Sequence, residues 1–204
     1  MKYEVHVTVD AEGISIEDFR EACWRLKVKP IEIILKEGTE MKDLMTSGTR
    51  DFDDDKKAFD WAKEQEEFLN ANGFKVLRVK IETQPEHPLA PKTRKDEMPD
   101  GSYFETHIQM TLVRPEFMDI LEEFIRRNKV HLSRNAFKQQ ADGKMVYMLT
   151  YRSTDCYGKF YSTKSKFILD FLEHFEDVAV LRPANVEFIL FDSKQSHDDR
   201  WLQV

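Results

Sequence analysis

YEVHVTV at residues 3–9 has an apolar side chain at every second position and polar side chains between them. A period of two is typical of a β-strand that buries one face. FETHIQM at residues 104–110 repeats both the alternation and the Glu-x-His spacing. Because each stretch precedes an amphipathic helix pattern, the two together indicate an α+β chain made of two similar halves.

Each half predicts the element order strand, helix, strand, strand, helix, strand. In the first half, Ser15 begins a helix as its N-cap, with Asp18 three residues later as in a capping box. In the second half, Asp142-Gly143 is predicted to form a hairpin turn. The predicted strands are 3–9, 31–36, 44–47, 74–82, 104–112, 130–137, 145–151 and 178–191, and the predicted helices are 16–26, 51–72, 115–125 and 162–175.

Further matches between the halves indicate an internal duplication. Met45 corresponds to Met148, and Val76-Leu77-Arg78 corresponds to Val180-Leu181-Arg182. Each half is therefore predicted to be a ferredoxin-like unit, an antiparallel sheet with both helices on one face. We expect the two uncovered sheet faces to pack against each other, with the helices outside. The predicted boundaries are 1–83 and 102–193 for the two halves, 84–101 for a proline-rich linker and 194–204 for a C-terminal tail.

Composition and charge narrow the class of protein. The chain has 204 residues, of which 41% are hydrophobic, enough for a packed core. The net charge of −7 argues against nucleic acid or anionic membranes as partners. The charged start MKYEVHVTVD and the lack of long apolar runs predict neither a signal peptide nor a membrane span, hence a cytoplasmic protein. Cys23 and Cys156 lie too far apart for a metal-binding motif.

Strand alternation brings a set of polar side chains to the sheet face opposite the helices. If Val5 and its alternating neighbours face the helices, the polar residues between them point the other way. The same parity applies to the second half and to the strand at 74–82. The residues predicted on or beside this face are Glu4, His6, Thr8, Arg50, Arg78, Lys80, Glu105, His107, Gln109, His131, Arg152 and Arg182.

The remaining histidines are predicted at the surface. His87 falls in the proline-rich linker, His174 on the last helix and His197 in the polar tail. His131 differs from them, because its alternation with Val130 and Leu132 directs it toward the presumed cleft between the halves.

One short motif suggests acid-base chemistry. His6-Val7-Thr8-Val9 resembles the H-x-T-x element of the two-histidine phosphoesterases, although His107-Ile108-Gln109-Met110 has Gln in place of Thr or Ser. The resemblance implies that His6 and His107 act as general acid and base on a phosphate ester. Glu4 and Glu105 would then orient the two imidazoles.

Two other interpretations of the same residues remain open. Glu4, His6, Glu105 and His107 together offer two carboxylates and two imidazoles, which many first-row metals accept as ligands. Alternatively, these side chains only solvate the sheet or join the halves in a non-catalytic scaffold. We assign no metal ligand and no cofactor from the sequence.

Over nearly its full length, the chain is similar to a family of uncharacterised bacterial proteins with tandem βαββαβ repeats. The shared motifs are His6-Val7-Thr8-Val9, Arg78-Val79-Lys80-Ile81-Glu82, Tyr103-Phe104-Glu105-Thr106-His107, His131-Leu132-Ser133-Arg134-Asn135-Ala136, Phe191-Asp192-Ser193 and Trp201-Leu202. This resemblance implies no activity. The residues predict a binding protein whose cleft holds an anionic small molecule, phosphorylated ones included, through Arg50, Arg78, Arg152 and Arg182. A phosphoesterase-like hydrolase and a non-catalytic interaction protein are the alternatives, and the oligomeric state is not predicted.

Overall fold

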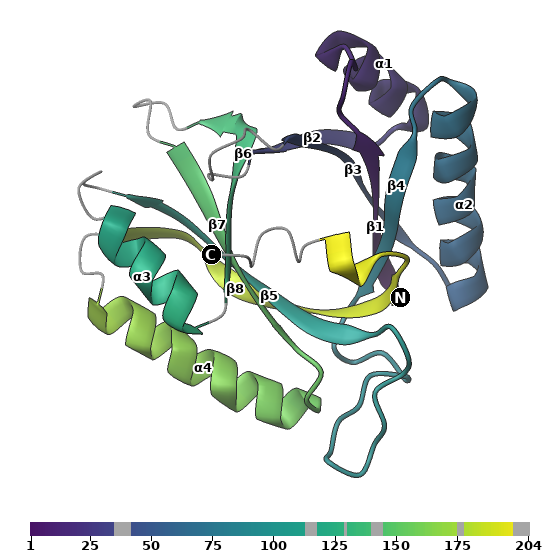
Figure 1. Cartoon of the computed structure of the whole chain (residues 1–204). Coiled ribbons are helices and arrows are strands. Elements are labelled where there is room, and N and C mark those ends of the chain that lie inside the picture. Colours follow the sequence, from purple (N-terminus) through teal and green to yellow (C-terminus); the bar gives the residue numbers. More distant parts are fainter. Residues whose placement is uncertain (35–41, 113–117, 129, 140–144, 175–177, 198–204) are drawn as a thin grey trace.

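A computed structural model describes residues 1–34, 42–112, 118–128, 130–139, 145–174 and 178–197 (Figure 1). The predicted turn at Asp142-Gly143 and the Trp201-Leu202 motif lie outside these residues, as does the predicted start of the third helix at residue 115. None of the helices in the described ranges is long and apolar enough to span a membrane.

The predicted element order is confirmed in both halves. The described part of the first half contains β1 (Lys2–Asp10), α1 (Ile16–Leu26), β2 (Lys29–Ile34), β3 (Lys42–Asp51), α2 (Asp55–Ala71) and β4 (Val76–Thr83). The second half contains β5 (Tyr103–Leu112), α3 (Met118–Asn128), β6 (His131–Gln139), β7 (Met145–Ser153), α4 (Tyr157–His174) and β8 (Val178–Asp192).

Two boundaries in the first half differ from the prediction for identifiable reasons. β3 extends to Asp51 because it pairs with β1 along almost its whole length, from Lys2 opposite Asp51 to Asp10 opposite Asp43. α2 consequently begins later, and the Asp54 side chain caps it by accepting a hydrogen bond from the backbone N–H of Lys57 at 2.9 Å. The predicted Ser15 cap of α1 is confirmed.

The described strands form one closed antiparallel barrel instead of two sheets packed face to face. The strand order is β1-β3-β2-β6-β7-β5-β8-β4, so each half keeps the ferredoxin-like order, with its first strand between its third and fourth. The halves join edge to edge, β2 with β6 and β4 with β8, and the helices lie outside (Figure 1). Closure pairs the edge strands that two separate sheets would leave unpaired, while the polar faces still share one interior.

The apolar core lies between the barrel and its outer helices. Val5, Val7 and Val9 are fully buried there, as their alternation predicts. This core cluster also contains Phe104, Phe160 and Phe188 from the second half, so one continuous apolar layer spans both halves. A second cluster under α3 and α4 includes Ile108, Met110, Leu121, Phe124, Leu149 and Phe171.

Candidate functional site

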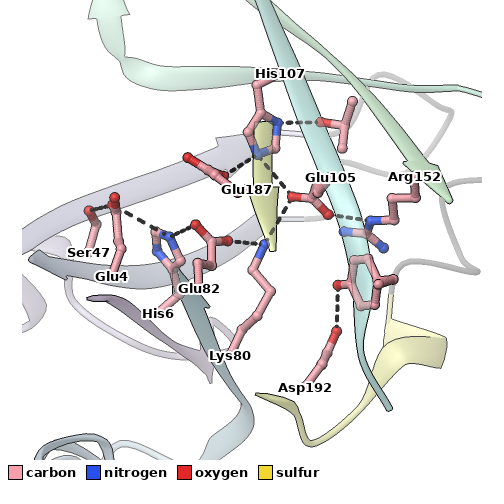
Figure 2. A network of polar contacts seen from close by, with 12 residues as sticks. Glu4, His6, Ser47, Lys80, Glu82, Glu105, His107, Arg152, Glu187 and Asp192 are labelled. Carbon is pink, nitrogen blue, oxygen red and sulfur yellow. Dashed lines mark hydrogen bonds and ion pairs between the residues drawn. The ribbon is translucent and has the colours of Figure 1, made fainter. Parts of the chain in front are cut away.

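The polar faces of the two halves meet inside the barrel in two groups of the same composition (Figure 2). Glu4, His6 and Glu82 form the first triad, and Glu105, His107 and Glu187 form the second triad. Glu4 lies directly opposite Glu82 in the pairing of β1 with β4, and Glu105 lies opposite Glu187 in the pairing of β5 with β8. The two triads therefore occupy equivalent positions in the two halves.

In the first triad, one ring nitrogen of His6 faces two carboxylates. Its Nε2 lies 3.5 Å from Glu4 Oε1 and 3.3 Å from Glu82 Oε2. Its Nδ1 lies 3.1 Å from the backbone carbonyl oxygen of Thr46, and a carbonyl oxygen can only accept. Nδ1 therefore carries a hydrogen, and Nε2 is the ring nitrogen directed at the two carboxylates. Glu4 also accepts a hydrogen bond of 2.7 Å from the Ser47 hydroxyl.

The second triad is similar but tighter. His107 Nε2 lies 2.9 Å from Glu105 Oε1 and 3.5 Å from Glu187 Oε2. Its Nδ1 lies 2.9 Å from the Thr150 hydroxyl, which can donate or accept. The short contact with Glu105 is the distance of a direct hydrogen bond, so this imidazole is held mainly by one carboxylate.

Lys80 connects the two triads. Its buried ammonium lies 2.5 Å from Glu82 Oε1 and 3.1 Å from Glu105 Oε1. The other oxygen of Glu105 accepts a hydrogen bond from Arg152 Nε. A continuous chain of charged groups thus runs from His6 to His107, and Figure 2 shows Lys80 and Glu82 between the two imidazoles.

Neighbouring charges of opposite sign, more than burial, set the pKa values of the two histidines and of Glu82 and Glu105 in this network. Burial alone would lower the pKa of both histidines, but the carboxylates beside them raise the pKa of His6 and raise that of His107 to about 10. Burial would raise the pKa of Glu82 and Glu105, but the adjacent cations hold both well below the ordinary value. Glu187 differs, because burial and the Glu82 carboxylate raise its pKa.

Alkaline pH is expected to weaken the fold through His107. Its pKa is raised on folding, so its contribution to stability is complete below pH 6.5 and is lost as the pH rises through about 10. In metal-free buffer, the melting temperature should fall between pH 7 and 10. His107→Gln should show a shallower fall over the same range, because it lacks the His107 imidazole and keeps that of His6. Equal slopes for the two proteins would contradict this assignment.

The arginines predicted to bind an anion are not gathered at one place. Arg78 Nε donates to Asp192 at 2.8 Å, and Arg152 is bound to Glu105. Arg50 lies over the Trp61 ring and opposite Tyr3 in the strand pairing, which puts it on the helix side of the barrel. The backbone of Arg182 pairs with Gln109 in β8, but its side chain lies outside the described residues.

Thr8 and His131 are both buried on the strands of the barrel. Thr8 lies opposite Arg78 in the pairing of β1 with β4. His131 lies opposite Thr150, which in turn lies opposite His107, so these three residues form a row across β6, β7 and β5. Directly opposite residues share a face, which directs His131 toward the second triad, as its alternation predicts.

The sequence analysis missed the second carboxylate of each triad. Glu82 has the same strand parity as Arg78 and Lys80, so a continuation of that alternation would have found it. Simple alternation along β8 from Arg182 does not place Glu187 on the same face. The pairing of β8 with β5 contains register shifts between His107 and Met110, and these shifts interrupt the alternation.

Two histidines predicted at the surface are buried. His87 Nε2 lies 2.9 Å from Asp55 Oδ1, and its ring stacks on Phe188. His197 Nε2 lies 2.8 Å from Asp43 Oδ2. The surface prediction was wrong for both because the linker and the start of the tail fold back onto the barrel, which local composition does not reveal. The side chain of His174 lies outside the described residues.

No protein-family model and no curated protein matches the sequence. Solved structures similar to this chain include an unknown protein from Galdieria sulphuraria, with 12% identity, 93% of this chain and 98% of that chain covered, and a TM-score of 0.29. The acetolactate synthase small subunit from Thermotoga maritima has 11% identity, 92% and 96% coverage, and a TM-score of 0.31. A heme-binding protein from Thermus thermophilus has 13% identity, 93% and 91% coverage, and a TM-score of 0.33. Similarities of this size do not bear on function.

Proposed function

We propose that this protein binds a divalent first-row transition metal ion inside the barrel, with Glu4, His6 and Glu82 as ligands. The observation that carries the proposal is the arrangement of His6 between the Thr46 carbonyl and the two carboxylates. Metal-binding histidines commonly donate their second ring N–H to a carbonyl or carboxylate, which turns the other nitrogen toward the ion. The hydrogen bond from Ser47 to Glu4 supports a ligand in the same way.

The two distances from His6 Nε2 to the carboxylate oxygens fit a shared ion, and the three ligand atoms lie within 4.8 Å of one another. Nitrogen and oxygen ligands lie about 2.0–2.1 Å from a zinc ion, so two ligands of a tetrahedral site are roughly 3.3–3.4 Å apart. His6 Nε2 lies 3.3 and 3.5 Å from the two carboxylate oxygens. A direct hydrogen bond would bring such atoms to about 2.9 Å. The first triad is therefore spaced for an ion between its members.

The charges of the network balance when both imidazoles carry a proton. Among the described residues of the network, the carboxylates are Glu4, Glu82, Glu105 and Glu187, and the permanent cations are Lys80 and Arg152. Because the raised pKa values of His6 and His107 favour protonated imidazoles, four carboxylates face four cations, which leaves no positive charge spare for an anion. A divalent ion in the first triad would take the place of the proton on His6 Nε2. The anionic ligand and the two-histidine hydrolase remain predictions from sequence, but Arg78 and Arg152 already have carboxylate partners.

Zinc titration of the full chain tests the proposal. Glu4→Gln is the most informative variant, because Glu4 is one-third exposed and glutamine can still accept the Ser47 hydrogen bond. We expect calorimetry to show zinc binding to the wild type and binding weakened at least about 10-fold in Glu4→Gln, the lower end of what disturbed metal shells lose. Glu64→Gln, an exposed position on α2, should bind zinc like the wild type.

Cobalt and phosphate provide two further readouts of the same proposal. Cobalt bound at a tetrahedral site should give a visible absorption band in the wild type that Glu4→Gln reduces. A thermal shift with inorganic phosphate but none with zinc or cobalt would overturn the metal assignment and favour the anionic ligand.

A further inference from the structure

Each half of the barrel supplies one Glu-His-Glu triad, so two equal metal sites would be expected. The contacts of the two triads differ, however. Among the described residues, the contacts of Glu4 are with His6 and the Ser47 hydroxyl. Both oxygens of Glu105, in contrast, already contact permanent cations. Oε1 lies 3.1 Å from Lys80 Nζ, and Oε2 accepts a hydrogen bond from Arg152.

Lys80 contacts the carboxylate oxygen that does not face the imidazole in the first triad, and the oxygen that does face the imidazole in the second triad. On Glu82 it contacts Oε1, while His6 faces Oε2, so the oxygen nearest the imidazole stays available for an ion. On Glu105 it contacts Oε1, which is the same oxygen that faces His107. An ion in the second triad would therefore share its ligand atom with the ammonium, at a distance where like charges repel strongly.

The strand pairing identifies the position at which the two halves diverge. His6 lies opposite Lys80 on β4, whereas His107 lies opposite Asn185 on β8. The first half thus supplies a lysine where the second half has a neutral side chain. That lysine reaches across the β4–β8 junction to the carboxylate of the other half (Figure 2).

Resting on the proposed metal function, we propose that Lys80 closes the second triad to metal and so restricts the barrel to one divalent ion, held by Glu4, His6 and Glu82. Arg152 supports this effect by holding the other oxygen of Glu105. Lys80 is then a specificity-determining residue that contacts no metal itself. Its ammonium takes the place of the second ion.

Zinc stoichiometry in the full chain tests this proposal, measured by calorimetry and by metal analysis after desalting. We expect one ion per chain in the wild type, one in His107→Asn and none in His6→Asn. Lys80→Met should bind two, because the second triad gains a free ligand oxygen. Lys80→Arg keeps the positive charge and should stay at one. Circular dichroism of each metal-free variant checks that it folds.

The outcomes separate this inference from the function on which it rests. Two ions in the wild type, or one ion retained by His6→Asn, would overturn the closure of the second triad while metal binding itself stands. One ion in a folded Lys80→Met would overturn the role of Lys80. If Lys80→Met does not fold, the comparison of His6→Asn with His107→Asn still decides whether the second triad is closed. No zinc binding by the wild type would overturn the proposed function.

Discussion

Asp192→Asn is expected to lower the free energy of unfolding by about 3–5 kcal/mol, the usual cost of removing one partner of a buried ion pair. Asp192 accepts hydrogen bonds from Arg78 Nε at 2.8 Å and from the Tyr103 hydroxyl at 2.8 Å. Its carboxylate has no exposed surface, and the Arg78 side chain is 6% exposed. The substitution would remove the Asp192 charge from beside a buried guanidinium at the junction of β4 and β8. Urea unfolding measures the effect.

Two comparisons show whether the charge is the cause. Replacing both partners, as in Arg78→Met with Asp192→Leu, should recover most of the loss, because it removes the buried positive charge together with its carboxylate. Asp60→Asn removes an exposed partner of Lys56 on α2 and should change stability by less than about 0.5 kcal/mol. A loss of less than about 1 kcal/mol in Asp192→Asn, or none recovered in the double variant, would contradict the prediction.

Phe104→Ala is expected to cost about 3–5 kcal/mol, as is typical when a buried aromatic ring is deleted. Phe104 is fully buried, and its ring centroid lies 5.4 Å from that of Phe188, 5.5 Å from Phe160 and 5.6 Å from Tyr157. These neighbours belong to β8 and α4, which are anchored in the strands and helices around them. They cannot collapse into the space, so a cavity remains in the apolar layer that spans both halves.

The matched control for this cavity is an exposed aromatic residue. Trp24 on α1 is 78% exposed, so Trp24→Ala should shift the denaturation midpoint little. Phe104→Ala should lower that midpoint without abolishing the cooperative transition. A midpoint close to that of Trp24→Ala would mean that Phe104 does not support the core as described.

Much of the local architecture could be predicted from sequence because it depends on neighbours along the chain. The alternation in residues 3–9 assigned Val5 and Val7 to the helix side and His6 to the interior, and both assignments follow from the two-residue period of a strand. Ser15 predicted the start of α1 because its hydroxyl accepts a hydrogen bond from the backbone N–H of Asp18, only three residues away. The pairing of Glu4 with His6, and of Glu105 with His107, follows from the same parity.

What the sequence alone determined is the order of elements, its recurrence in the second half, and the buried and polar faces of strands such as β1 and β5, because each of these depends on short-range periodicity. The tertiary structure decided that the halves join edge to edge, because closure depends on hydrogen bonds between strands far apart in sequence, such as β4 with β8. It also decided the site. The distance from Lys80 to Glu105, and the selection of Glu82 and Glu187 as partners of the histidines, arise only once the barrel closes and buried charges must find opposite charges across it.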